Sequence, residues 1–363
     1  MIPSDIIKRV PKVELHHHLD GGLRPSTVIE LSNKQGIKLP ADNEKDLKDW
    51  FEKGCRLKSL TLYLQTFSVT TAIMQDEESL ARIAYETVLD WHAENVVYGE
   101  VRFAPIFHTA KGLSMARVVE AVLRGMEQGK KETGVCYGVI LCAMRHQSPE
   151  ISLEVAKLAV AFRDRGVVGF DLAGDESGNP PKKHIEAFQY IRKKNFNITL
   201  HAGEAFGLDS IWQAIQVCGA HRIGHGTRLV EDVNYEGLRI ESMGDLAHYV
   251  LDKRIPLEMC LSSNIGTGAA PSFAEHPFQL FFRNHFRVFL CTDNPLMSDT
   301  TMTKEMQIAA DNYGLTLKDL ERISVNAMKS SFIHHDEKLT LIYQVIKKQF
   351  ADIRQEYGYS DWN

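Results

Sequence analysis

The sequence predicts an α/β protein in which eight parallel strands, alternating with helices, close into a (β/α)₈ barrel of the TIM type. Three observations support this fold. Short apolar runs rich in β-branched residues recur eight times, segments with helical periodicity separate them, and metal-binding residue types follow several of the runs. An open doubly wound sheet is the alternative, but eight strands without a G-x-G-x-x-G turn favour closure.

The expected strands are the short apolar runs themselves: Val13–His16, Val96–Phe103, Val135–Ala143, Val167–Leu172, Phe196–His201, Arg222–His225, Pro256–Cys260 and Arg287–Thr292. The segments between them repeat apolar residues every three or four positions, which indicates helices. These expected helices are Ser79–Glu94, Met115–Thr133, Ile151–Arg165, Lys182–Lys194, Asp209–Cys218, Gly244–Asp252 and Ser272–Asn284.

Two segments depart from this repeat. About eighty residues separate the first two strands, and they include helical patterns at Pro25–Gln35 and Leu57–Thr71. An insertion in the loop after the first strand lies over the catalytic face of a barrel, so it is a candidate lid. A helical tail, Thr303–Tyr357, is expected to pack on the barrel exterior. Because no linker or low-complexity tract interrupts the chain, residues 1–363 are expected to form one domain.

The composition restricts the partners. A net charge of −5, with acids and bases mixed throughout, argues against nucleic acid as a ligand. No run approaches the roughly 18 apolar residues that a membrane helix requires, and the N-terminus lacks the apolar core of a signal peptide. Six cysteines without C-x-x-C spacing are typical of free thiols in a reducing compartment. We therefore expect a cytoplasmic protein without membrane partners.

Four histidines and one aspartate stand at the ends of the expected strands. His16 and His18 alternate on the first strand, so they share a face while His17 points away. The others, each closing a later strand, are His201, His225 and Asp293. A single histidine at a strand end is more often structural, but several in register at the catalytic edge of a barrel are not expected by chance. Imidazole and carboxylate are the usual ligands of catalytic zinc.

Glu204 follows the third of these histidines by three residues, in the motif HAGE. A carboxyl group in a loop is often only solvated, but one placed beside a metal site is a candidate general acid or base. Glycines at neighbouring strand ends, including Gly174, either form turns or let the backbone approach a ligand. The residue types therefore predict a metal-dependent hydrolase.

The motifs that carry these residues resemble those of the adenosine deaminase family, in the amidohydrolase superfamily. They occur in the family's order over nearly the whole chain: KVELHHHLDG (12–21), YGEVRFAP (98–105), FDLAGDE (170–176), TLHAGEAFG (199–207), RIGHGTR (222–228), CLSSNIGTGA (260–269) and CTDNPLMS (291–298). The resemblance implies one zinc ion per chain, held by His16, His18, His201 and Asp293. It also implies a small-molecule partner, a purine nucleoside.

The resemblance further implies roles for individual residues. Glu204 would protonate purine N1, and His225 would orient or deprotonate the water that attacks the base. Asp20 would contact the ribose 5′-hydroxyl, the backbone of Gly174 would contact purine N3, and His18 would also border the substrate. Four apolar residues at helical spacing match a gate over the substrate, although a plain core stripe explains them equally well: Leu60, Tyr63, Leu64 and Phe67.

One position departs from the family pattern. Many members read T-D-D-P where this chain has T-D-N-P, so that the residue expected to bond purine N7 is Asn294. A T-D-N variant resembles that of some bacterial members. We therefore expect altered base recognition with activity retained.

The implied activity is hydrolysis of adenosine, and of 2′-deoxyadenosine, to inosine and ammonia in purine salvage. The alternatives are a deaminase of adenine, AMP or a modified adenosine, of which AMP would require an Arg/Lys cluster at the ribose end. A binuclear metallohydrolase is a further alternative, but it commonly needs a lysine or extra acid at the fourth strand, where only Asp171 and Asp175 stand. A binding protein without catalysis is disfavoured because every catalytic residue type is intact.

Overall fold

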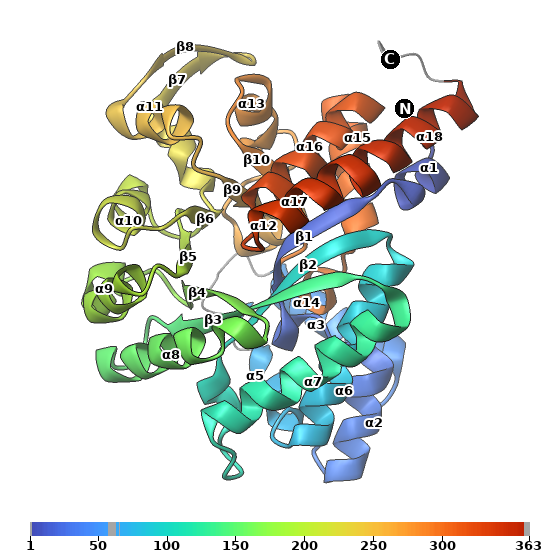
Figure 1. Ribbon diagram of the computed structural model, residues 1–363, viewed down its shortest axis with the longest axis vertical. Coiled ribbons are helices and arrows are strands. Elements are labelled where there is room, and N and C mark those ends of the chain that lie inside the picture. Colours follow the sequence, from blue (N-terminus) through green and yellow to red (C-terminus); the bar gives the residue numbers. More distant parts are fainter. Residues whose placement is uncertain (1, 57–62, 65, 359–363) are drawn as a thin grey trace.

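Eight parallel strands form the centre of the molecule, and helices cover their outer side (Figure 1). The computed structural model describes residues 2–56, 63, 64 and 66–358. The strands pair in the order β1-β2-β3-β4-β5-β6-β9-β10, and their bounds are Lys12–His18, Val96–Phe103, Cys136–Met144, Val167–Ala173, Asn197–Ala202, Arg222–His225, Leu257–Met259 and Val288–Leu290. The predicted barrel is therefore confirmed, with most strand bounds within one or two residues of those expected.

The barrel closes between its last and first strands, directly beside the metal-binding residue types. The backbone of Asp293, just after β10, donates to the His16 carbonyl at 2.7 Å and accepts from the His18 amide at 2.8 Å. Asp293 itself has a positive φ of 60°, which is uncommon for a residue other than glycine. Closure of the barrel therefore places Asp293, which follows the last strand, beside His16 and His18 of the first strand.

Three of the helices between the strands, α6, α7 and α8, begin at polar caps. The side chains of Asp76, Ser114 and Ser148 accept backbone N–H bonds at the starts of α6, α7 and α8, each satisfying a donor that the helix leaves free. Helix α6 (Glu77–Ala93) precedes β2. The helices that follow the later barrel strands are α7 (Met115–Thr133), α8 (Pro149–Ala161), α9 (Ile185–Lys193), α10 (Leu208–Trp212), α11 (Asp245–Asp252) and α13 (Phe278–Arg283).

Three helices differ from the expected bounds by four residues or more, and one pair of strands was not expected. The helix predicted at Ser272–Asn284 begins only at Phe278, because Pro277 lies at its N-cap. The segment Asp209–Cys218 continues from α10 into a π-helical turn. Helix α8 stops at Ala161 and is followed by a 3₁₀ turn, Arg163–Arg165. A hairpin of β7 (Val233–Glu236) and β8 (Arg239–Met243) stands apart from the barrel, paired only with itself.

The insertion after β1 contains α2 (Pro25–Gln35), α3 (Glu44–Cys55) and α5 (Phe67–Ile73). Helix α2 has the predicted bounds, α3 was not predicted, and part of the predicted helix Leu57–Thr71 lies outside the described residues. The insertion packs against α14 (Pro295–Ser298), the short helix that follows Asp293. Thr66 Oγ1 lies 3.3 Å from Met297 Sδ, and Cys55 Sγ lies 3.6 Å from Ser298 Oγ. The insertion therefore rests on the segment that carries Asp293.

The C-terminal tail packs on the barrel exterior, as predicted. It consists of α15 (Met302–Tyr313), α16 (Leu317–Ser330), α17 (His335–Thr340), a π-helical turn (Leu341–Ile346) and α18 (Lys347–Tyr357). Ser324 donates to the Pro11 carbonyl just before β1, and Asn326 to the Val288 carbonyl on β10. Helix α18 lies beside α1 (Ser4–Arg9), where Arg9 pairs with Glu356 at 2.6 Å (Figure 1). The tail thus supports the seam at which the barrel closes.

All six cysteines are free thiols, and five of them are buried. Among the helices that the structure describes, none is both long and apolar enough to cross a lipid bilayer.

Candidate functional site

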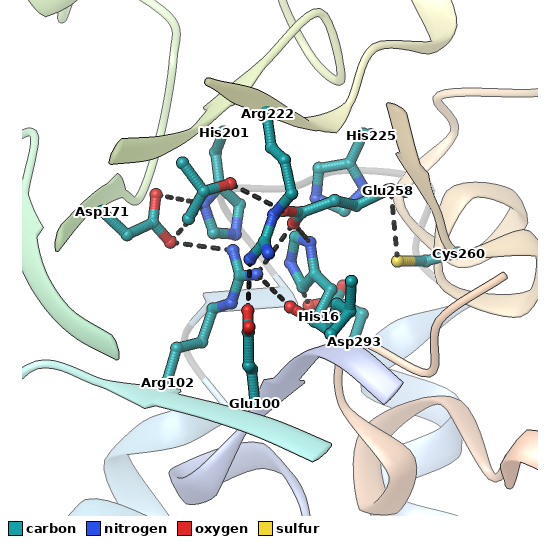
Figure 2. Close-up of polar contacts among 12 residues, drawn as sticks. His16, Glu100, Arg102, Asp171, His201, Arg222, His225, Glu258, Cys260 and Asp293 are labelled. Atoms are coloured by element: carbon teal, nitrogen blue, oxygen red, sulfur yellow. Dashed lines mark hydrogen bonds and ion pairs between the residues drawn. The ribbon is translucent and has the colours of Figure 1, made fainter. Parts of the chain in front are cut away.

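The predicted metal-binding residues converge at the carboxyl edge of the barrel (Figure 2). His16 and His18 come from β1, His201 from β5, and Asp293 from the loop after β10. His18 Nε2 and His201 Nε2 are 3.1 Å apart, and Asp293 Oδ1 lies 3.4 Å from His16 Nε2 and 3.3 Å from His18 Nε2. The four ligand atoms all lie within 4.8 Å of one another.

This set of atoms fits a single cation. His16 Nε2 is buried and has no hydrogen-bond partner, and imidazole nitrogens approach one another this closely when they face a common ion. Imidazole and carboxylate are ligand types that zinc takes in proteins, and the four side chains are enough to hold one ion. His17, by contrast, packs edge-on against Trp91 at a ring-centroid distance of 5.5 Å, so it points away from the cluster as predicted.

The opposite atom of each ligand side chain is anchored by a second residue. His16 Nδ1 lies 2.7 Å from Glu258 Oε2, and His201 Nδ1 lies 3.0 Å from Asp171 Oδ2. Because these carboxylates accept, each imidazole carries its proton on Nδ1 and keeps the Nε2 lone pair for the metal. Asp293 Oδ2 accepts from Ser263 Oγ at 2.5 Å, which leaves Oδ1 for the cluster.

Two buried arginines, Arg102 and Arg222, bind these supporting carboxylates (Figure 2). Arg102 donates to Asp171 at 3.0 Å and to Glu258 at 2.8 Å, and Arg222 donates to Glu258 at 2.5 Å and to Glu100 at 2.6 Å. Against the opposing effect of burial, Arg102 and Arg222 hold the pKa of Glu258 well below its ordinary range, and His201 together with Arg102 does the same for the pKa of Asp171. The ionised carboxylates of this network and of the cluster outnumber the two guanidinium groups, which favours a bound cation.

Residues of this supporting network were not predicted to have a role. Glu258, Arg102 and Arg222 are fully or almost fully buried on strands. The available signal was a charged residue inside an apolar run, as in VRF, HRI and LEM, because a buried charge must be paired. Asp171 was considered only as an extra metal ligand, and the structure instead places it against His201.

Glu204 lies on the open side of the cluster, on the loop after β5, and is 5% exposed. Burial, with the nearby charges of Asp293 and Glu176, raises the pKa of Glu204 to about 8. The Thr267 hydroxyl donates to Glu204 Oε1 at 2.9 Å, and Glu204 Oε2 lies 3.5 Å from His225 Nε2. A carboxyl group held neutral in this way can donate a proton at neutral pH.

Glu176 supports the loop that carries Glu204, and its role was not predicted. It accepts the backbone N–H of Phe206 at 2.7 Å, and that of Glu204 lies 3.5 Å away. Beneath the same loop, Arg145 donates to the His201 carbonyl at 2.5 Å. The two residues therefore hold the HAGE turn, on which His201 and Glu204 face the same space.

His225 closes β6 with a positive φ of 64° and borders the same space. Burial, together with the nearby His16, lowers its pKa well below the ordinary value, so that the ring is neutral. Its Nδ1 faces the side chain of Asn264 at 3.0 Å, and its Nε2 faces Glu204. The imidazole is thus fixed at both ends.

A mostly apolar cavity opens above the cluster. Its lining residues combine the predicted site residues with apolar side chains: His18, Asp20, Tyr63, Leu64, Phe67, Ala104, Phe107, Cys142, Met144, His146, Ala173, Gly174, His201, Glu204, His225, Asp293 and Asn294. Three of the four predicted gate residues therefore border it, and Leu60 lies outside the described residues. Tyr63 is also part of the core and packs edge-on against Phe67, so the gate and core interpretations both apply.

Three residues that were expected to contact the substrate border the cavity: Asp20, Gly174 and Asn294. Asp20 is 5% exposed, its Oδ1 has no partner, and burial raises its pKa to about 7. Gly174 has a φ of 99°, a conformation that side chains rarely adopt, and so turns its backbone toward the cavity edge. Asn294 Oδ1 is buried and unpartnered, and a Cβ at Gly21 would come within 1.9 Å of it.

The fold and this site define a barrel hydrolase with a cation-binding cluster of side chains at the carboxyl edge of its strands. Comparison with known proteins narrows the class. The model of the family described as "Adenosine deaminase" matches residues 11–348. "Adenosine deaminase 1" of Streptomyces coelicolor is 49% identical over 359 residues, covering 97% of this chain and 90% of the relative. The chain belongs to the adenosine deaminase family, in the amidohydrolase superfamily, and is a hydrolase.

Solved structures share the fold. The N6-mAMP deaminase of Arabidopsis superposes with a TM-score of 0.81 at 28% identity, covering 96% of this chain and 99% of that one. An amidohydrolase of Burkholderia ambifaria, solved with bound Zn, superposes with a TM-score of 0.86 at 21% identity and covers 99% of this chain and 96% of that one. At 21% identity, the likeness to the Burkholderia protein is evidence of a shared fold only.

Proposed function

We propose that this chain uses one zinc ion to hydrolyse adenosine, and 2′-deoxyadenosine, to inosine and ammonia. The observation that carries the proposal is the meeting of two groups at one cavity. Three histidines and Asp293 converge on a cation position, and the buried Glu204, whose neutral form is favoured, faces the same space. Hydrolysis at a purine ring requires an activated nucleophile and a proton donor, because the ring must gain a nucleophile and a proton together. A cation-binding site and a neutral carboxyl group at the same cavity can supply both.

The metal role follows from the donor set described above. Bound there, a zinc ion would lower the pKa of a water molecule from about 15.7 to about 7 and supply hydroxide at neutral pH. The chain's own residues then do the remaining work. His225 orients or deprotonates the attacking oxygen, and Glu204 gives its proton to purine N1 as electron density accumulates there. The C6–N bond breaks, and the proton that remained on the attacking oxygen leaves with ammonia.

The cavity supports a nucleoside in preference to a nucleotide. Among the described residues that line it there is no arginine or lysine, so nothing there would neutralise a 5′-phosphate. Asp20 offers a carboxyl group at the expected ribose end, and a 5′-hydroxyl can bond either of its protonation states because it both donates and accepts. This argument disfavours AMP, although a relative of this fold is named for a modified AMP.

A side-by-side assay tests the function. Zinc-loaded protein is expected to convert adenosine and 2′-deoxyadenosine, followed by the loss of absorbance near the adenine maximum, with a kcat/KM at least tenfold above those for adenine and AMP. Faster turnover of adenine or AMP than of adenosine would assign the chain to a sibling activity. Turnover of none of the four would contradict the proposal.

Asp20→Ala is expected to weaken adenosine far more than adenine, because only adenosine carries the ribose. A lost hydrogen bond to a group of this kind costs about 1–3 kcal/mol, which is roughly a 5- to 150-fold fall in kcat/KM. Asp20→Asn keeps an acceptor oxygen and is the matched control, with a smaller loss. Equal losses for adenosine and adenine in Asp20→Ala would remove Asp20 from the ribose end.

Asn294 is expected to read purine N7 by donating its side-chain amide hydrogen. N7 only accepts, and an asparagine amide donates at any pH, whereas an aspartate there must be protonated. A 7-deaza adenosine lacks the acceptor and leaves the amide unpaired, so its kcat/KM should fall by about 1–3 kcal/mol, roughly 5- to 150-fold. In Asn294→Ala the preference for adenosine over the 7-deaza analogue should disappear. Wild-type protein that turns over both substrates equally would show that Asn294 does not contact N7.

A further inference from the structure

The role of His225 depends on which of its ring nitrogens carries the proton. The neutral imidazole has one N–H and one bare nitrogen, so one end donates and the other accepts. Nε2 faces the reaction space, 3.5 Å from Glu204 Oε2, and Nδ1 faces Asn264 at 3.0 Å. If Nε2 is bare it can take a proton from the attacking water. If Nε2 carries hydrogen, it can only donate.

The structure determines this choice through a second histidine, His276. The backbone N–H of Phe278 points to His276 Nδ1 at 3.1 Å. A backbone N–H can only donate, so His276 Nδ1 must be the bare, accepting nitrogen. His276 is 3% exposed, and burial lowers its pKa to about 3, so the ring is neutral. Its single hydrogen is therefore on Nε2.

Asn264 transmits this constraint to the active site. His276 Nε2 lies 3.1 Å from Asn264 Oδ1 and must donate to it, which fixes the orientation of the side-chain amide. The NH₂ group of Asn264 then faces His225 Nδ1 and donates to it. His225 Nδ1 accepts this hydrogen bond and therefore carries no hydrogen, so the ring hydrogen of His225 is on Nε2.

The reverse orientation of Asn264 is unfavourable. Turning its amide would set the NH₂ group against the N–H of His276, two donors in contact, in a site where both side chains are buried. A buried donor that faces another donor loses its hydrogen bond and stays desolvated, so the orientation described here dominates. The backbone N–H of Phe278 therefore determines which group donates in each hydrogen bond of the series, from His276 through Asn264 to His225.

We propose that Asn264 and His276 are positioning residues that hold His225 as the Nε2–H tautomer, so that His225 donates a hydrogen bond to the oxygen that attacks C6. The proposal rests on the proposed function and decides between its two roles for His225, orienting the attacking oxygen and deprotonating it. The water proton then passes to solvent before attack, and the solvent returns a proton to Glu204 after each turnover. No proton is stored on the His225 ring.

Nitrogen NMR of the zinc-loaded full chain tests the tautomer directly. With ¹⁵N-labelled histidine, two-bond ¹H–¹⁵N correlations distinguish a ring nitrogen that carries hydrogen from one that is bare. The signals of His225 are identified by their loss in His225→Gln. The expected result is hydrogen on Nε2 and a bare Nδ1 for both His225 and His276. Hydrogen on Nδ1 of His225, or on both of its nitrogens, would overturn the proposal.

Asn264→Asp tests the transmission with nearly the same shape. A carboxylate only accepts, so it should draw the His225 hydrogen to Nδ1 and leave Nε2 bare. We expect this switch in the spectrum together with a fall in kcat of at least tenfold and an unchanged zinc content. In serine proteases the wrong histidine tautomer costs about 10⁴-fold, so a large effect is reasonable. An unchanged His225 spectrum in this variant would contradict the role of Asn264.

The control is Asn326→Asp, a buried asparagine on α16 whose amide bonds the Val288 carbonyl. It introduces the same chemical change away from the cavity and should alter neither the His225 tautomer nor kcat. If Asn264→Asp does not fold, the wild-type spectrum alone decides. Failure of this proposal can be distinguished from failure of the proposed function. Wild-type protein that deaminates adenosine but has the opposite His225 tautomer would contradict only the hydrogen-bond series. Protein without deaminase activity would contradict the proposed function, while the spectrum would still report the tautomer.

Discussion

Replacing Glu204 by Gln is expected to lower kcat for adenosine by about 10²–10⁴-fold, the usual effect of losing a general acid. Glutamine keeps the shape of the side chain and can still bond purine N1, but it cannot deliver a proton. Its amide can also still accept from Thr267, which donates to Glu204 in the native protein. Folding and zinc content should therefore be unchanged, and the loss should appear in kcat and not in KM.

A matched control separates this loss from the effect of altering any buried glutamate. Glu305 is fully buried outside the cavity, where it accepts from Thr300 Oγ1 at 2.6 Å. Glu305→Gln should leave kcat within about twofold of the native value, because Glu305 does not line the cavity and touches none of the reacting atoms. Near-normal kcat in Glu204→Gln, measured with correct folding and zinc content, would show that another group protonates the base.

Removal of the metal is expected to abolish adenosine turnover, and one zinc ion per chain should restore it. Without a cation, water in this cavity keeps a pKa near 15.7 and the cluster of His16, His18, His201 and Asp293 has nothing to coordinate. Elemental analysis of purified protein should give about one zinc per chain, because three imidazoles and one carboxylate suit one ion. Two metals in stoichiometric amount would instead support the binuclear alternative.

A pair of histidine variants makes the metal test specific. His18→Ala should lose stoichiometric zinc and activity, because it removes one of four converging ligand atoms. His92→Ala, at an exposed position on α6, should keep both. Zinc retained in His18→Ala at the native affinity would place the metal elsewhere.

The fold and most of the site residues followed from local signals in the sequence. Apolar runs at regular intervals predicted the strands, and a strand's alternation placed His16 and His18 on one face with His17 on the other. The predicted ligands come together in the structure, because parallel strands bring their carboxyl ends to one edge of a barrel. Tyr63, Leu64 and Phe67, for which the family resemblance implied a gate, border the cavity.

Elements without such signals were missed. Helix α3, Glu44–Cys55, has a strongly polar sequence, and only its N-cap, Asn43, marked its start. The β7–β8 hairpin is mostly exposed and lacks the apolar alternation of a core strand. Local periodicity reports burial, so an element that buries little leaves little trace in the sequence.

The sequence by itself determined the barrel, the ligand residue types and the place of Glu204, because each depends on a pattern that spans only a few neighbouring residues. Only the tertiary structure decided how those residues are held. Glu258 contacts His16 although 242 positions of the chain separate them. Asn264 joins His225 to His276 through its side-chain amide, whose orientation depends on the backbone N–H of Phe278. A hydrogen bond depends on which groups face each other after folding, and no local pattern encodes that pairing.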